Sequence, residues 1–294
     1  MNATAQRRRK AKGHAEQGTT QPLGKANRRN ETTAPKIGAS FVPATSPRAP
    51  CPRRVASLLY VFPHPDDESF GPAPALAKQT RAGHDVHLLT LTRGEATTQR
   101  ERLGFSKAKM GRVRREEMQE VARVLGLTDL TVLDFPDGAL EELDPRVLED
   151  AVAEQVRACR PEVLVTYAAH GVSGHRDHLT THAVVKRVFC ERRGTGATDN
   201  LRRLALFTLA EETDGEHGGP PAHLRASPPA WIDGRVRFSE DDRARAEEAL
   251  AAYETYRPVI EKHRPLRQVA EGVCFELFQE AFAPPLDSLF ERLP

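Results

Sequence analysis

Short apolar segments alternate with amphipathic ones along the chain from residue 55 onward. Strand-like runs occupy residues 57–62, 85–91, 131–133, 162–167, 203–209 and 273–278. Apolar residues at helical spacing predict helices at 73–81, 112–125, from 145 onward, at 179–189 and at 241–262, the last kinked or interrupted at Pro258. Because strand and crossover helix repeat in this way, the sequence predicts an α/β fold with a mostly parallel sheet between two layers of helices.

Turn and capping residues delimit several of these helices. Gly126 follows the apolar pattern at 112–125 and is typical of a residue just past a helix end. Asp144 and Pro145 are typical of an N-cap and a first helical position. In the helix that they begin, Val147 is among the residues expected to face the core.

The first 54 residues differ in composition from the rest. They hold 12 Lys or Arg against 2 acidic residues, with almost no periodic apolar positions. This composition predicts a disordered basic arm over 1–54, followed by a single folded domain over 55–294. The arm could contact nucleic acid or another anionic surface, or be a solvated tail without a dedicated partner.

The overall composition indicates a soluble globular protein. Of the 294 residues, 39% are hydrophobic and 29% are charged, and no apolar run reaches the ~18 residues that a transmembrane helix needs. The four cysteines, Cys51, Cys159, Cys190 and Cys274, are far apart and never in Cys-x-x-Cys spacing. We therefore expect a reduced, cytoplasmic protein.

The first candidate for chemistry follows the strand at 57–62. His64 lies between two prolines, which stiffen the loop, and the acidic residues Asp66, Asp67 and Glu68 come next. Carboxylates this close repel one another at a buried strand end unless a cation or a basic partner compensates them. One interpretation is a divalent metal site with His64 and Asp67 facing the ion. The other is an exposed acidic turn with a helix-capping aspartate.

A second cluster follows the strand at 162–167. It contains His175, Asp177 and His178, with His182 one helical turn further on. In an open parallel α/β sheet, sites form beyond the carboxyl ends of the strands, so clusters about a hundred residues apart can meet. Two neutral imidazoles and one carboxylate, with a fourth position for water, are a ligand set used by catalytic zinc sites.

Four motifs together resemble a known family, the zinc-dependent N-acetylglucosaminyl deacetylases called PIG-L or LmbE-like. They are PHPDDE at 63–68, TRGE at 92–95, FPDG at 135–138 and GHRDH at 174–178, in the family's order and roughly its spacing. The resemblance covers about residues 55–280, and its first and last motifs are the specific ones. It implies a three-layer Rossmann-like fold and removal of the N-acetyl group from a small substrate that contains N-acetylglucosamine.

The resemblance also implies roles for individual residues. The zinc ligands would be His64, Asp67 and His178. Ferrous iron would also suit this ligand set. Asp66 would be the general base, because it lies beside a ligand without being one. His175 would stabilise the oxyanion or protonate the leaving amine, and Asp177 would hold the other nitrogen of that imidazole.

Further polar residues have two interpretations each. Arg93 would clamp substrate hydroxyls or a substrate carboxylate, or it would form an ion pair with an acid at 66–68. Asp137 would bind sugar hydroxyls or simply make a turn. His182 and His170 would be additional ligands or buried histidines outside the ligand set.

Two positions depart from the family pattern. Arg176 stands where proline is usual, and its charge would select an acidic substrate or point to solvent. Ser173 stands where some members have a tyrosine that assists the tetrahedral intermediate. The residues at 213–229, rich in Gly, Pro and His, would border the cleft and help to choose the group attached to the sugar.

Three other functions remain open. They are an amide hydrolase acting on a non-sugar substrate, a non-catalytic carbohydrate-binding protein on the same scaffold, and a metal-dependent phosphoesterase. The joint presence of His64, Asp66, Asp67 and His178 argues for an enzyme. Two-metal phosphoesterases generally need more ligands than this set provides.

Overall fold

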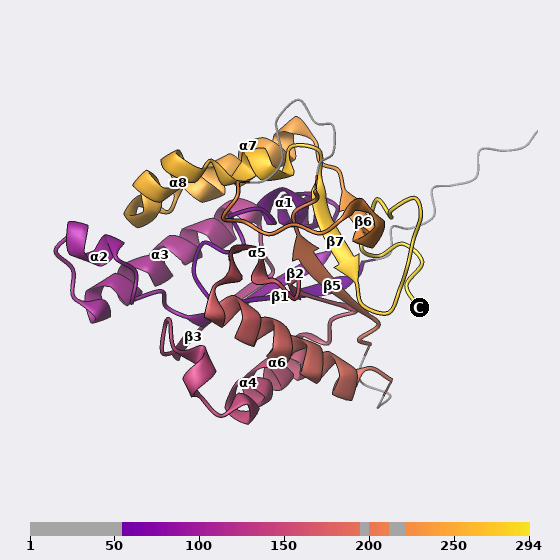
Figure 1. Cartoon of the computed structure of the whole chain (residues 1–294), viewed down its shortest axis with the longest axis horizontal. Coiled ribbons are helices and arrows are strands. Elements are labelled where there is room, and N and C mark those ends of the chain that lie inside the picture. The colour runs from indigo at the N-terminus through magenta and orange to yellow at the C-terminus, as the bar shows by residue number, and fades with distance from the viewer. Residues whose placement is uncertain (1–54, 195–199, 212–220) are drawn as a thin grey trace, which may run out of the picture. The chain divides into compact units, whose positions relative to one another are not determined.

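The structure, a computed structural model, describes residues 55–194, 200–211 and 221–294. The predicted arm at 1–54 and the first part of the loop at 213–229 lie outside these ranges. The described residues form a seven-stranded sheet with the strand order β3-β2-β1-β4-β5-β7-β6 and with helices on both faces (Figure 1).

The sheet is parallel from β3 to β5. β1 pairs with β2 and β4, β2 with β3, and β4 with β5, whereas β7 is antiparallel to both β5 and β6. The strands are β1 Ser57–Phe62, β2 Asp85–Thr92, β3 Asp129–Phe135, β4 Val163–Tyr167, β5 Arg203–Thr208, β6 Gly234–Val236 and β7 Val273–Leu277. The predicted Rossmann-like, mostly parallel sheet is confirmed. The sequence pattern missed β6, because three residues are too few to show an alternation.

Helices cover the sheet in two layers (Figure 1). α1, α3 and α7 pack together on one face, and α4 and α6 pack together on the other. The α-helices are α1 Ala73–Arg81, α2 Gln99–Arg102, α3 Lys107–Leu125, α4 Pro145–Cys159, α5 Gly171–Gly174, α6 Arg176–Arg192, α7 Glu240–Ala251 and α8 Arg257–His263. Short 3-10 helices lie at Leu140–Glu142, Pro229–Trp231, Glu254–Tyr256 and Pro265–Val269. Across the described ranges, every helix is too short or too polar to cross a membrane.

The central strand β1 is buried on both faces. Leu58, Tyr60 and Phe62 belong to the core beneath α1, α3 and α7, while Leu59 and Val61 belong to the core on the opposite face. Successive strand side chains point to opposite faces, so a strand covered on both sides needs an unbroken apolar run. Because all five side chains are fully buried, the carboxyl end of β1 is held firmly where the first acidic motif begins.

The region after residue 240 differs most from the prediction. The helix predicted at 241–262 is divided into α7, a 3-10 turn and α8, so the chain leaves the helical path before Pro258. Pro258 lies in the first turn of α8, where a missing backbone N–H breaks no helical hydrogen bond. The prediction for Val147 is also wrong, since this side chain is 50% exposed on α4.

Asp242 fastens the start of α7 to α1. Its carboxylate accepts a hydrogen bond from the Ser239 backbone N–H at 2.9 Å in a capping box, and another from Arg81 Nε at 2.8 Å. We expect Asp242→Ala to lower the free energy of unfolding by about 1–2 kcal/mol in denaturant titrations, because the cap is lost. Asp241→Ala, an exposed position in the same turn, is the control and should change it by less than ~0.5 kcal/mol.

The contribution of Asp242 should also depend on pH. Burial raises the pKa of its carboxyl, but Arg81 and Ser239 outweigh this effect and lower the pKa to about 2. A depressed folded-state pKa stabilises the fold above the unfolded value of ~3.9, and this stabilisation is lost as the pH falls toward 2. Equal destabilisation by the Asp241 and Asp242 variants at neutral pH would contradict the capping role.

Candidate active site

The two predicted clusters meet because β1 and β4 are neighbours in the sheet. The loop after β1 carries His64 and Asp67, and the first turn of α6, which follows β4, carries His178. Asp67 lies between the two imidazoles. Its Oδ2 is 3.4 Å from Nδ1 of His64, and its Oδ1 is 3.3 Å from Nε2 of His178. The structure therefore brings the three predicted metal ligands together.

The Asp67 carboxylate is held by the chain around it. The His64 backbone N–H donates to Oδ2 at 2.8 Å, and the Tyr167 hydroxyl donates to Oδ1 at 2.8 Å. Burial alone would raise the pKa of Asp67, but His178 and His64 hold it well below its usual range. Asp67 is therefore an anion in a fixed orientation, as a metal ligand must be.

His178 presents one particular nitrogen toward Asp67. Its Nδ1 lies 2.9 Å from the Gly171 carbonyl oxygen, which can only accept, so Nδ1 carries the proton. The Tyr167 ring stacks on the imidazole with centroids 4.2 Å apart, which fixes the plane of the ring. With Nδ1 bonded to the carbonyl, Nε2 is the nitrogen that faces Asp67, which is the arrangement of a metal-binding histidine with a backbone acceptor on its other nitrogen.

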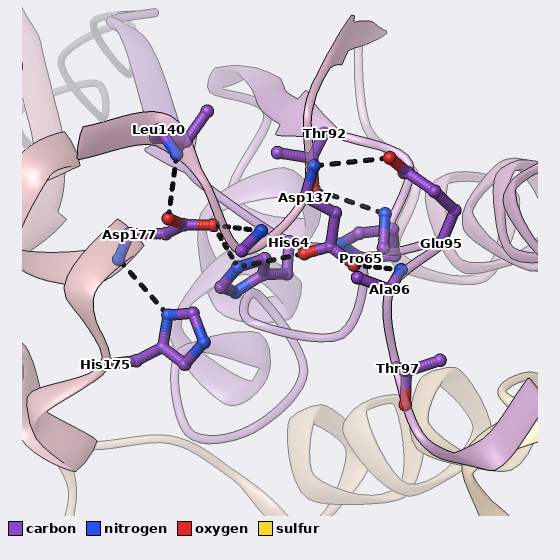
Figure 2. A network of polar contacts seen from close by, with 12 residues as sticks. His64, Pro65, Thr92, Glu95, Ala96, Thr97, Asp137, Leu140, His175 and Asp177 are labelled. Carbon is purple, nitrogen blue, oxygen red and sulfur yellow. Dashed lines mark hydrogen bonds and ion pairs between the residues drawn. The ribbon is translucent and has the colours of Figure 1, made fainter. Parts of the chain in front are cut away.

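Three carboxylates lie near His64, and Figure 2 shows two of them, those of Asp137 and Asp177. Besides the contact with Asp67, the Nε2 of His64 lies 3.0 Å from Asp177 Oδ2 and 3.4 Å from Asp137 Oδ1. Burial lowers the pKa of the imidazole, yet Asp67, Asp177 and Asp137 together raise it to about 10. The surplus of negative charge makes this a favourable position for a cation.

Asp177 differs from its predicted role. Its carboxylate contacts His64 and accepts hydrogen bonds from the backbone N–H groups of Gly138 at 2.8 Å and Leu140 at 3.1 Å (Figure 2). The His175 ring instead accepts a hydrogen bond from the backbone N–H of Asp177 at 3.2 Å and so caps α6. Asp177 therefore holds the His64 imidazole, whereas the resemblance implied that it holds His175.

Asp66, the predicted base, has its own basic partner. Arg114 on α3 is only 1% exposed, and its Nη2 donates to Asp66 Oδ2 at 2.7 Å and to the Pro65 carbonyl at 2.6 Å. Burial raises the pKa of Asp66 to about 7, with Arg114 opposing the rise and Asp67 adding to it. The backbone of Asp66 has φ of 90°, a conformation that non-glycine residues rarely adopt. These contacts fix one oxygen of the Asp66 carboxylate.

Gly94 allows Arg114 to approach. Gly94 has φ of +63°, and a Cβ added there would lie 2.4 Å from Arg114 Nη1. We expect Gly94→Ala to displace the guanidinium from Asp66 and to lower the rate of any reaction that uses Asp66 by ~10-fold or more. Gly104→Ala is a matched control, since Gly104 has the same φ of +63° with nothing within 4 Å of its added Cβ. Equal effects of the two substitutions on steady-state turnover would show that backbone strain, and not Arg114, is responsible.

The two predicted substrate residues have different surroundings. Arg93 forms an ion pair with Asp134 on β3, and not with the acids at 66–68. Asp137 does more than make a turn, because its Oδ2 accepts a hydrogen bond from the Ala96 backbone N–H at 2.6 Å while its Oδ1 faces His64. Glu95, the last residue of the TRGE motif, accepts a hydrogen bond from the Asp137 N–H at 3.2 Å (Figure 2).

The structure shows the contacts of the four residues whose roles the sequence left open, His170, Ser173, Arg176 and His182. His182 Nδ1 contacts the Tyr167 carbonyl at 2.8 Å, and His170 Nδ1 accepts from the Val172 N–H at 3.0 Å, so both have structural partners of their own. Arg176 is exposed and pairs with Glu141 at 2.6 Å. Ser173 remains close to the site, with its Oγ 3.3 Å from His178 Nδ1.

A cavity of about 270 Å³ lies beside the site. Asp66, Asp67 and His178 line one part of it, together with Tyr167 and Ser173. The remaining lining residues are Phe70, Val172, Phe207, Leu209, Pro221, His223, Leu224, Val259, His263, Pro265 and Gln268. Three of the groups proposed for chemistry, Asp66, Asp67 and His178, thus share one cavity, which the second half of the chain helps to enclose.

Arg114 and Tyr167 are the contacting residues that sequence reasoning missed. Tyr167 was part of a predicted strand, and nothing in the pattern marked its hydroxyl as a partner of Asp67. Arg114 did leave a signal, since it lies at helical spacing between the buried residues Met110 and Met118. An arginine in the apolar stripe of a helix needs a buried acceptor, and Asp66 is that acceptor.

The fold and the site together define an α/β protein that gathers histidine and aspartate side chains at the carboxyl edge of its parallel sheet, where they can hold a metal ion. Residues 59–189 match the family PIG-L, described as GlcNAc-PI de-N-acetylase.

Similar curated proteins carry the names of deacetylases or of an amidase. A 1D-myo-inositol 2-acetamido-2-deoxy-alpha-D-glucopyranoside deacetylase of Kineococcus radiotolerans is 34% identical over 173 residues, which cover 50% of this chain and 47% of the relative. A mycothiol S-conjugate amidase of Streptomyces coelicolor is 33% identical over 150 residues, which cover 45% of this chain and 51% of the relative. The chain thus spans about half the length of these curated relatives.

A solved structure supports the fold over a longer stretch. The N,N'-diacetylchitobiose deacetylase from Pyrococcus horikoshii superimposes with a TM-score of 0.57 at 17% identity. The superposition covers 76% of this chain and 84% of that protein. At this identity the likeness shows the shared fold, and the chemistry has to be argued from the site.

Proposed function

We propose that the protein is a metal-dependent N-deacetylase that hydrolyses the acetamide of an N-acetylglucosamine conjugate. One observation carries the proposal: a proton acceptor, Asp66, shares a cavity with the metal-ligand candidates Asp67 and His178. All three lie within the part of the chain that matches the de-N-acetylase family. The catalytic domain would extend over residues 55–294.

The ligand set fits a metal ion held by His64, Asp67 and His178. Ligands around a tetrahedral zinc ion, with bonds of about 2.0–2.1 Å, lie about 3.3–3.4 Å from one another. The contacts of Asp67 with the two imidazoles, at 3.4 and 3.3 Å, have this length. Asp67 offers a different oxygen to each imidazole. The groups whose ligand atoms all lie within 4.8 Å of one another are two others, His64 with His175 and His178, and His64 with Asp137 and Asp177. We favour the Asp67 set because Asp67 contacts both histidines, while His175 and Asp177 are engaged as caps and backbone acceptors. Zinc is our first candidate and ferrous iron the second.

Asp66 would act as the general base. A metal ion at the site would activate water and stabilise the oxyanion. Asp66 lies beside the ligands without being one, and Arg114 fixes one of its oxygens while the carboxylate lines the cavity. Its pKa of about 7 suits a group that accepts a proton from water at neutral pH.

His175 would assist the leaving amine. It is exposed at the start of α6, and its ring lies edge-on to His64 with centroids 4.7 Å apart. Because its Nδ1 accepts a hydrogen bond from the backbone, its Nε2 is the nitrogen that can face a substrate. Asp137 and Arg93 would bind sugar hydroxyls, although Arg93 would first have to exchange its contact with Asp134.

Hydrolysis of another amide is the second candidate. The relative from Streptomyces coelicolor is named an amidase, and much of the cavity lining is apolar. The two candidates differ in the group attached to the amide nitrogen.

The test is amine release from N-acetylglucosamine glycosides by the full chain, with bound metal quantified. Zinc and ferrous iron should each be supplied to metal-free protein under anaerobic conditions. About one metal per chain together with amine release would support the proposal. A protein that binds no metal, or that binds metal and releases amine only from non-sugar amides, would contradict it.

A further inference from the structure

The cavity beside Asp66 is much larger than an acetyl group requires. An acetyl methyl is close in size to a water molecule, whose share of liquid volume is about 30 Å³. The cavity measures about 270 Å³. If the amide carbonyl lies next to Asp66, Asp67 and His178, most of the cavity extends beyond the methyl group of an acetamide.

The wall of this extra space is largely apolar. Phe70 comes from the first loop, Phe207 and Leu209 from β5 and the residues after it, Leu224 from the following loop, and Val259 from α8. The Phe207 ring is seated against Gly71, where an added Cβ would lie 2.4 Å from the ring. The ring therefore has little room to move toward Gly71 and forms a firm side of the cavity.

The polar candidates for sugar recognition lie elsewhere. Arg93, Asp137 and His175 are not among the residues that line the cavity. Asp137 contacts His64 directly, and the His175 ring lies edge-on to the His64 ring. A hexose in this space would have His223, His263 and Gln268 as its polar partners beyond the groups proposed for chemistry, and each hydroxyl left unsatisfied costs about 1–3 kcal/mol. The site thus has a polar side for the sugar and an apolar side for the other substituent of the amide, which is the acyl group.

We propose that the apolar cavity binds the acyl chain of the substrate and that the protein removes N-acyl groups of about four to eight carbons from an amino sugar. This inference rests on the proposed hydrolytic function and changes its substrate class. Water adds its oxygen to the acyl carbon, the C–N bond breaks and the nitrogen takes a proton. The products are the free amine and a carboxylate that keeps the whole chain.

The test compares one glucosamine glycoside that carries N-acetyl, N-butyryl, N-hexanoyl or N-octanoyl groups, using the metal-loaded full chain. Each methylene buried in an apolar site can raise kcat/KM by up to about fourfold. We expect kcat/KM for the best longer chain to exceed that for acetyl at least tenfold. If acetyl is the best substrate by tenfold or more, the acyl inference is wrong while the deacetylase function stands. If no N-acyl sugar is cleaved, both the acyl inference and the proposed deacetylase function are contradicted.

A variant links the preference to the cavity. Val259→Phe should lower the ratio of the hexanoyl to the acetyl kcat/KM at least tenfold, because the larger side chain fills the space. Val147→Phe, at an exposed position on α4, is the control and should leave this ratio unchanged. The octyl glycoside of N-acetylglucosamine tests whether the cavity binds the aglycone instead of the acyl chain. If the octyl group on the sugar raises kcat/KM at least tenfold and longer acyl groups do not, the cavity binds the aglycone and the inference is overturned.

Discussion

Asp66→Asn is expected to lower kcat for amide hydrolysis by about 10²–10⁴-fold while the protein keeps its metal. The asparagine oxygen can still accept from Arg114, so the loop after β1 should keep its conformation. A neutral amide cannot take a proton from water, and the loss should therefore appear in kcat more than in KM. Steady-state kinetics with metal analysis of the same samples would measure both quantities.

The control for this substitution is Asp85→Asn, since Asp85 is exposed at the start of β2. It should leave kcat and metal content unchanged. If Asp66→Asn keeps more than a tenth of the wild-type kcat, another group accepts the proton. If it loses the metal, Asp66 contributes to the ligand set.

His178→Ala should abolish metal binding and lower activity by about 10³-fold or more, because metal activation of water provides several kcal/mol of the catalysis. The Nε2 of His178 faces Asp67 Oδ1, which also accepts a hydrogen bond from the Tyr167 hydroxyl. Mass spectrometric metal analysis after loading and desalting would give the stoichiometry, and circular dichroism would verify the fold.

His182→Ala provides a matched control on the next turn of α6. His182 is also buried, but its Nδ1 contacts the Tyr167 carbonyl. We expect this variant to keep about one metal per chain, with a loss of stability of about 1–2 kcal/mol from the unsatisfied carbonyl. Metal retained by His178→Ala and lost by His182→Ala would reverse the two assignments.

Much of the fold was readable from local pattern. The run at 57–62 predicted β1 to the residue, because a strand buried on both faces requires continuous apolar side chains. Asp144 and Pro145 likewise marked the beginning of α4. The division of the predicted helix at 241–262 was harder, since Pro258 suggested a break at the wrong place. The chain leaves the helix after Ala251, about two turns earlier, and Tyr253 just beyond it is fully buried and donates to Glu68.

The sequence predicted which residues lie close together at the site better than it predicted which of them contact one another. That His64 and His178 meet follows from adjacent parallel strands, which the alternating pattern implied. The partner of each polar group depends on distances across the fold that no spacing reveals. Asp177 reaches His64, on the other loop, although His175 is only two residues away, because its carboxylate turns toward the N–H groups of Gly138 and Leu140. Arg114 is 48 residues from Asp66 in sequence and was missed for the same reason.

Two different parts of the chain line the cavity. The groups assigned to chemistry come from residues 59–189, the part that matches the PIG-L family, whereas Leu209, Leu224 and Val259 come from beyond it. If the cavity binds the acyl chain as we propose, selection can alter the preferred chain length without disturbing the proposed metal ligands. A small library confined to these three positions should yield variants that differ in acyl preference while their metal affinity stays constant.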